Sequence, residues 1–142
     1  MRPQSAYNNR LPNVTPGEKI ISALTYLTTG IVGFIWIIIS HVSGSKIKPF
    51  LRFHIFQSIF LSILFYIFNL ILTILIGIVV KIPLIGSLIY SVYFYIFDLK
   101  LVFGYSIVDA LAFAIILYLV LSALTGREGK LPWVSDIVKG ML

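Results

Sequence analysis

The sequence contains no cysteine and few charged residues. Of its 142 residues, 11% are charged and 59% are hydrophobic, and the mean hydropathy is +1.03. Without cysteine the chain forms no disulfide, no thiolate nucleophile and no cysteine-ligated zinc site. An average soluble domain carries roughly a quarter charged residues, so this chain has too few charges to cover its surface in water. The composition therefore predicts a protein that is covered largely by lipid.

The residue patterns of common catalytic and metal sites are also missing from the sequence. Its histidines, His41 and His54, are thirteen positions apart and lack the one-turn spacing of a metal-binding pair on a helix. There is no glycine-rich phosphate loop followed by lysine, and Asp98 and Asp109 are eleven positions apart. We therefore expect a protein that is not an enzyme and that binds no cofactor or metal.

Positive charge is in excess, with 11 Lys and Arg residues against 5 Asp and Glu. Nucleic-acid binding would require basic residues clustered on one folded face. Here most of them flank apolar runs, where a lysine or arginine near an anionic lipid surface gains about 1 kcal/mol. The flanking residues are Lys19, Lys46, Lys48, Arg52, Lys81, Arg127 and Lys130. The pattern predicts contact with lipid headgroups and no nucleic-acid partner.

The apolar runs predict an all-α integral membrane protein, a bundle of four transmembrane helices with a C-terminal interfacial amphipathic helix. The expected spans cover about residues 20–40, 53–80, 84–97 and 101–124, and the third is short. The second has no charged residue and at 1.5 Å per residue is about 40 Å long, which exceeds the roughly 30 Å hydrocarbon core. Three spans with a half-inserted helix are the alternative.

Polar segments flank this transmembrane domain, which we place at residues 18–125. Residues 1–17 are expected to form a flexible polar tail, and residues 126–142 an interfacial tail with Trp133 at headgroup level. With four spans, both termini would lie on the same side as Lys81. The distribution of lysine and arginine would then favour a cytoplasmic location for that side.

The start of the first helix has a recognisable capping sequence. Thr15 is suited to the N-cap, Pro16 to the first helical position, and Glu18 follows the cap by three residues. A threonine and a glutamate at this spacing can cap each other's backbone N–H groups. We therefore expect a helix to begin at Pro16.

Polar and small residues form one stripe along each of the first two expected spans. The first stripe contains Ser22, Tyr26, Thr29, Gly33, Trp36 and Ser40. The second contains His54, Ser58, Ser62, Tyr66, Asn69, Thr73 and Gly77. Because polar groups in lipid are costly, the two stripes should pack against each other. They either join the helices through small residues and hydroxyls or line a polar path.

Asp109 is the acidic residue expected near the middle of the last span, between Val108 and Ala110. A carboxylate at that depth costs a few kcal/mol, or it takes up a proton and becomes neutral. One interpretation is a hydrogen-bonded aspartate satisfied by Ser106, Ser62 or Tyr66. The other is a group that handles a proton or a substrate, or contacts a partner protein.

Two stretches of the sequence, residues 49–59 and 124–132, go beyond a general membrane pattern. They resemble the Tic-twenty family, the small multi-spanning subunit of the chloroplast inner-envelope protein import translocon, and its cyanobacterial and wider bacterial relatives. The matching residues are Arg52, Phe53, His54 and Gln57 at the start of a span, and Gly126, Arg127 and Pro132 after the last one. His54 stands where plant and cyanobacterial members more often have asparagine.

This resemblance implies a non-enzymatic membrane subunit of a protein import or translocation-like complex. Its partners would be the lipid bilayer, other membrane subunits and precursor polypeptides. The location would be a bacterial, cyanobacterial-type plasma or thylakoid membrane, or the chloroplast inner envelope or thylakoid. An accessory or assembly subunit of a respiratory or photosynthetic complex is the first alternative. A small-solute or proton transporter that uses Asp109 is the second.

Overall fold

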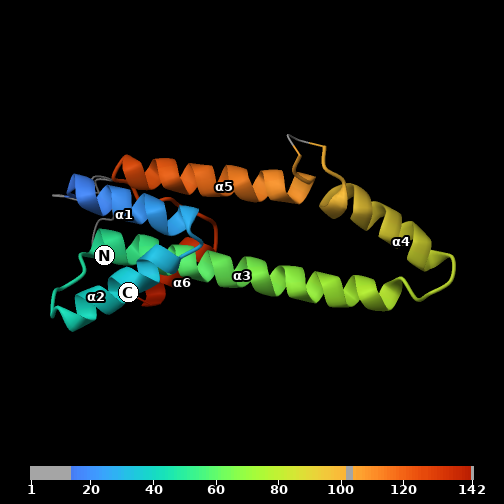
Figure 1. The fold of residues 1–142 in the computed structure, drawn as a ribbon, viewed down its shortest axis with the longest axis horizontal. Coiled ribbons are helices and arrows are strands. Elements are labelled where there is room, and N and C mark those ends of the chain that lie inside the picture. The colour runs from blue at the N-terminus through green and yellow to red at the C-terminus, as the bar shows by residue number, and fades with distance from the viewer. Residues whose placement is uncertain (1–13, 102–103, 142) are drawn as a thin grey trace, which may run out of the picture. The chain divides into compact units, whose positions relative to one another are not determined.

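The protein is helical in the computed structural model, which describes residues 14–101 and 104–141 (Figure 1). No strand occurs among these residues, so the prediction of an all-α chain is confirmed. The elements are α1 (Pro16–Leu27), α2 (Ile31–Val42), α3 (Pro49–Val79), α4 (Ile85–Tyr93), the π-helical segment η1 (Phe94–Asp98), α5 (Ile107–Leu124) and α6 (Val134–Met141). Most of the expected N-terminal tail lies outside the described residues.

The chain divides into two compact units. Unit 1 comprises the chain up to residue 62 together with residues 118 to the C-terminal end, and unit 2 comprises residues 63–117. Unit 1 therefore holds α1, α2, the first part of α3, the end of α5, and α6. Unit 2 holds the rest of α3, α4, η1 and the start of α5.

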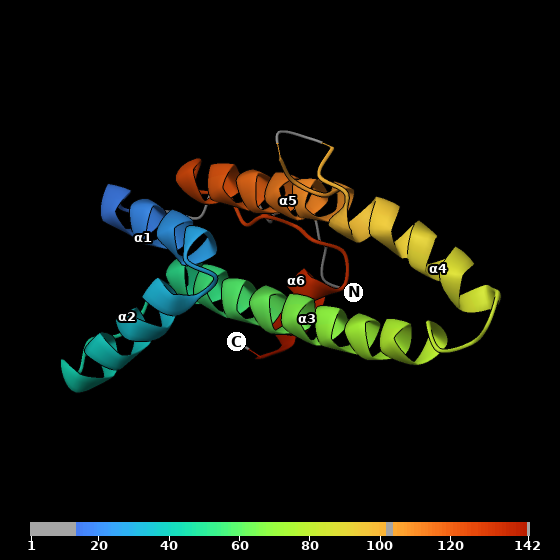
Figure 2. The same cartoon turned by 45° about the vertical axis from the view of Figure 1, so that its right-hand side comes forward.

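The expected first span is wrong as a single helix, because the chain turns back between α1 and α2 (Figures 1 and 2). Thr29 and Gly30 have φ angles of 51° and 90°, which a continuing right-handed helix does not allow. Gly30 also packs so closely on α3 that a Cβ there would lie 2.9 Å from Ile59 Cγ1. Each of the two helices has 12 residues, about 18 Å of rise, too short to cross a bilayer alone.

Two helices are long and apolar enough to cross a membrane, by length and composition. Helix α3 has 31 residues and a hydropathy of 2.7 in its most apolar part, and α5 has 18 residues and a value of 2.5. Their rises are about 46 Å and 27 Å, against a hydrocarbon core of roughly 30 Å. The two helices point to a membrane location, but they do not by themselves make the expected bundle of four spans.

The short third helix is present near its expected position, as α4 continued by η1. Gly86 follows the turn after α3 so closely that a Cβ there would lie 2.5 Å from the carbonyl oxygen of Val80. The absence of a side chain at Gly86 therefore permits the tight reversal between α3 and α4. Further along α4 and η1, aromatic rings stack on one another, with centroids 6.4 Å apart for Tyr90 and Tyr93 and 4.9 Å apart for Tyr93 and Phe97.

The expected C-terminal helix forms as α6, and its apolar side packs on the protein. Val138 is fully buried and, with Val134, contacts Phe53 of α3. The preceding Trp133 is 83% exposed and has a φ of 65°, a left-handed conformation that is costly for an aromatic residue. Helix α6 thus belongs to the core of unit 1, while the indole ring points away from that core.

Candidate functional site

The structure brings together the two sequence stretches that carry the family resemblance, and both lie in unit 1. The first stretch occupies the first turns of α3, and the second forms the connection between α5 and α6. Gln57 joins them, because its Nε2 donates a hydrogen bond of 2.9 Å to the backbone oxygen of Gly129. These positions are 72 residues apart, so this contact depends on the tertiary fold.

A buried polar cluster extends from this contact into α1. The hydroxyl of Tyr26 lies 2.7 Å from both Gln57 Oε1 and His54 Nδ1. All three side chains are at most 2% exposed. The hydroxyl has one proton and Gln57 Oε1 can only accept, so Tyr26 donates to Gln57. Its oxygen then accepts from His54, which assigns a proton to Nδ1 of the imidazole.

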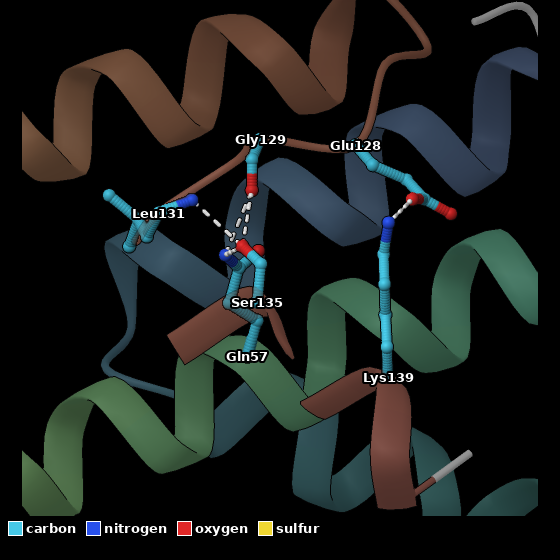
Figure 3. Close-up of polar contacts among 6 residues, drawn as sticks. All are labelled: Gln57, Glu128, Gly129, Leu131, Ser135 and Lys139. Carbon is cyan, nitrogen blue, oxygen red and sulfur yellow. Dashed lines mark hydrogen bonds and ion pairs between the residues drawn. The ribbon is translucent and has the colours of Figure 1, made fainter. Parts of the chain in front are cut away.

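Ser135 completes the cluster from the first turn of α6 (Figure 3). Its Oγ accepts hydrogen bonds from Leu131 N at 2.7 Å and from Gln57 Nε2 at 3.2 Å, and it donates to the oxygen of Gly129 at 3.2 Å. Both amide protons of Gln57 are therefore used. Burying polar groups costs free energy when they lack partners, and the hydrogen bonds within the cluster offset this cost.

Around the cluster, the other motif residues have structural contacts of different kinds. Phe53 is 1% exposed and forms the core on which α6 packs. The guanidinium of Arg52 lies 5.7 Å from the ring centre of Phe56 and is exposed. Gly126 has a φ of 74° and ends the last turn of α5, which is a common role for glycine. Pro132 is exposed and accepts a hydrogen bond from Val134 N through its carbonyl oxygen.

His54 occupies an aromatic cage that leaves one ring nitrogen without a hydrogen bond of good geometry. The rings of Phe50, Phe53 and Tyr26 meet the imidazole edge-on, with centroids 4.5, 5.5 and 5.6 Å away. The backbone of Arg127 is close enough to interact with the imidazole. Nε2 of His54 nevertheless makes no hydrogen bond of good geometry, and the same is true of the buried Oγ of Ser22.

Asp109 lies in the first turn of α5, whereas the sequence placed it near the middle of the last span. The helix starts only at Ile107, six residues later than expected. Asp109 N donates to Ser106 Oγ at 3.1 Å, and Ser106 N donates to Asp109 Oδ2 at 3.4 Å. This reciprocal pair caps the helix, where a carboxylate also interacts favourably with the helix dipole. Ser106 is thus the partner expected from the sequence.

The second polar stripe is only partly packed. His54 and Ser58 are buried in unit 1, but Tyr66 is 71% exposed. The remaining polar side chains on this stripe bond to their own helix: Ser62 to Ser58 O, Asn69 to Phe65 O and Thr73 to Asn69 O. The prediction of stripe-to-stripe packing therefore holds for the first turns of α3, where Ser22 and Tyr26 of the first stripe are also buried.

Sequence reasoning missed the buried residues that α6 and its preceding loop contribute. Gly129 and Ser135 were not among the expected site residues, and Thr25 was not part of the first stripe. Gly129 lies in the second motif stretch, which was the only sequence signal for it. Ser135 sits in a segment whose alternating apolar and charged residues predicted a surface helix, so no local pattern indicated its burial.

The chemistry of the cluster is that of a structural connection. In the part of the chain that the structure describes, no three His, Cys, Asp or Glu side chains are placed to hold a metal ion. The polar atoms of Tyr26, Gln57 and Ser135 bond mainly to each other and to backbone, and the cluster contains no carboxylate. Such an arrangement fixes α1, α3 and α6 against one another. No family model, curated protein or solved structure matches this chain.

Proposed function

We propose that this chain is a non-enzymatic membrane subunit of a protein import or translocation-like complex. Other membrane subunits and precursor polypeptides would be its partners. The membrane would be a bacterial, cyanobacterial-type plasma or thylakoid membrane or its chloroplast counterpart. The role and the location both follow from the resemblance to the Tic-twenty family, and α3 and α5 provide the membrane spans.

The observation that carries this proposal is the bond from Gln57 to Gly129. The two stretches that resemble the family are far apart in the sequence, yet they meet through this buried side chain. If each stretch were only a local helix-entry or helix-exit pattern, no contact between them would be expected. Their contact supports treating them as one structural motif, as a shared family fold would require.

The exposed polar part of α3 is the region we propose for polypeptide contacts. Tyr66, Asn69 and Thr73 occupy one side of a helix whose other exposed residues are mostly apolar. A small helical chain has too little interior for a pore of its own, so a conduit would need walls from other subunits. A bundle of four transmembrane helices would require the α1–α2 pair and α4 to cross the membrane as short or broken helices. We favour two spans, formed by α3 and α5.

Of the alternatives, the accessory-subunit hypothesis shares the apolar helices α3 and α5 as support, but not the contact between the two motif stretches. The transporter hypothesis has less structural support, because the carboxylate of Asp109 already accepts a hydrogen bond from the backbone N–H of Ser106. An intramembrane proton carrier would be expected deeper in a span. Substitution of Asp109 by asparagine is therefore expected to affect the start of α5 more than any transport.

Photo-crosslinking in native membranes tests the import proposal. A photoreactive amino acid at Tyr66 should crosslink to precursor polypeptides in transit. The matched control is Phe68, which is 49% exposed and lies about 200° around the same helix. It should give mainly lipid adducts. Equal polypeptide crosslinking from both positions would contradict the proposal, as would stoichiometric co-purification with a respiratory or photosynthetic complex from native nanodiscs.

A further inference from the structure

Charge is distributed unequally between the two units. Among the described residues, unit 1 has seven Lys and Arg side chains against three acidic ones, and unit 2 has two of each. The basic residues of unit 1 are Lys19, Lys46, Lys48, Arg52, Arg127, Lys130 and Lys139, and its acidic residues are Glu18, Glu128 and Asp136. Unit 1 thus carries the whole positive excess of the described chain.

Several of these basic residues come from separate segments that meet at one end of unit 1. The turn at Gly30 returns the chain, so the first turns of α1 and α3 and the last turn of α5 lie at the same end (Figures 1 and 2). The ion pair of Glu18 and Lys48, at 2.9 Å, joins α1 to the start of α3. Lys19 Cε lies 3.0 Å from where a Cβ of Gly126 would be. We call this region the basic end of unit 1.

Most of the acidic charge at this end is already paired within the protein. Glu18 pairs with Lys48, and Glu128 pairs with Lys139 at 3.0 Å (Figure 3). Within the described part of the chain, Asp136 alone of the three acidic residues forms no ion pair. The exposed side chains of Lys46, Arg127 and Lys130 have no acidic partner there. Positive charge therefore remains for an external anion.

Exposed apolar and aromatic side chains lie close in the sequence to two of the unpaired basic residues. Val42, just before the loop that contains Lys46, is 82% exposed, and Trp133, three residues after Lys130, is 83% exposed. Basic groups next to an exposed tryptophan and aliphatic side chains match the chemistry of a bilayer interface, where headgroup charge lies beside hydrocarbon. A soluble acidic partner would match the charge and leave these apolar side chains unexplained.

We propose that the basic end of unit 1 binds the headgroups of anionic phospholipids in the membrane that α3 and α5 cross. Lys46, Arg127 and Lys130 contact the lipid phosphates, and Trp133 lies at the level of the headgroups. The loop before α3 and the connection from α5 to α6 then face the anionic leaflet. The inference requires the membrane location but is independent of the import role.

Native mass spectrometry of the full-length protein from nanodiscs tests this proposal. The nanodiscs contain phosphatidylcholine mixed with phosphatidylglycerol, and the readout is the number of each lipid retained. The test variant carries Lys46→Gln, Arg127→Gln and Lys130→Gln, and the matched control carries Lys81→Gln and Lys100→Gln in unit 2. At about 1 kcal/mol for each basic residue, the test variant should bind phosphatidylglycerol about a hundredfold more weakly.

Two comparisons keep the outcome decisive. The control variant should retain phosphatidylglycerol like the unaltered protein, and a variant with Lys46→Arg and Lys130→Arg should do the same because it keeps both charges. Equal loss in the test and control variants would overturn the proposal. Retention of phosphatidylcholine and phosphatidylglycerol in equal proportion by the unaltered protein would overturn it as well.

Discussion

At the scale of single residues, Gln57 has the largest number of tertiary hydrogen bonds in the buried cluster. It accepts from Tyr26 and donates to Gly129 and Ser135, so it connects α1, α3 and the segment that leads into α6. The sequence placed Gln57 in a motif at the start of a span and at the beginning of a polar stripe. Its partners could not be inferred there, because 72 residues separate it from Gly129.

Replacing Gln57 by leucine should destabilise the protein. The change removes the hydrogen bonds of Gln57 to Tyr26, to the oxygen of Gly129 and to Ser135, and each buried hydrogen bond contributes about 0.5–1.5 kcal/mol. The matched control is Asn69→Leu, since the side chain of Asn69 bonds only to Phe65 O of its own helix. Thermal unfolding in nanodiscs should show a large loss for the first variant and little change for the second. Equal melting temperatures would show that the cluster is not stabilising.

Gly30 is the residue on which the turn between α1 and α2 depends. Gly30→Ala should destabilise unit 1, because the added Cβ would meet Ile59 and the backbone has a φ of 90°. The control is Gly44→Ala, where φ is also positive at 64° but nothing lies within 4 Å. The control should cost about 1 kcal/mol from backbone strain, and Gly30→Ala should cost a further 1–3 kcal/mol or so from overpacking. A similar loss in both variants would place the cost in the backbone alone.

At the scale of elements, α1 begins as the sequence predicts. The side chains of Thr15 and Glu18 cap each other's backbone N–H groups, at 3.4 and 2.9 Å, which confirms the capping box. Glu18 also pairs with Lys48. The local pattern was sufficient for the cap, because both partners lie within four residues. The ion pair depends on the fold and had no signal in the sequence.

This ion pair predicts that the stability of the folded protein depends on pH. Desolvation would raise the pKa of Glu18, but the hydrogen bond and charge of Lys48 and the hydrogen bonds with Thr15 outweigh it, so the pKa is below its ordinary value of 4.5. A lowered pKa contributes stability above pH 4.5, and this is lost as the pH falls through the pKa of the folded protein. Unfolding measured across this range should depend less on pH in Glu18→Gln. An unchanged pH dependence would contradict the prediction.

Helix α6 should depend on its buried contacts rather than on its own helical tendency, since eight residues are too few for an isolated helix. Val138→Ala removes fully buried methyl groups and should cost about 1–2 kcal/mol. Ile137→Ala is the control, because Ile137 is 44% exposed. Limited proteolysis should cut the C-terminal segment faster in the Val138 variant. Equal rates of cleavage would mean that α6 does not rely on this packing.

At the scale of the whole molecule, the topology in the membrane follows from which helices cross it. If only α3 and α5 cross, the loop before α3 and the turn after α5 lie on one side and α4 on the other. The natural absence of cysteine permits single-cysteine labelling without background. Ser45→Cys and Thr125→Cys should react with an impermeant reagent from the same side, and Ser87→Cys from the opposite side. Labelling of Ser45→Cys and Ser87→Cys from one side would contradict this topology.

The sequence by itself determined the helical class, the apolar character, the capping of α1 and the approximate positions of α3, α4, α5 and α6. Each of these depends on composition, on periodicity or on residues a few positions apart, which act locally. The tertiary structure decided the reversal at Gly30, the place of Asp109 at the start of α5, and the burial of Ser135. These features depend on close packing and hydrogen bonds between distant segments, so no local pattern encodes them.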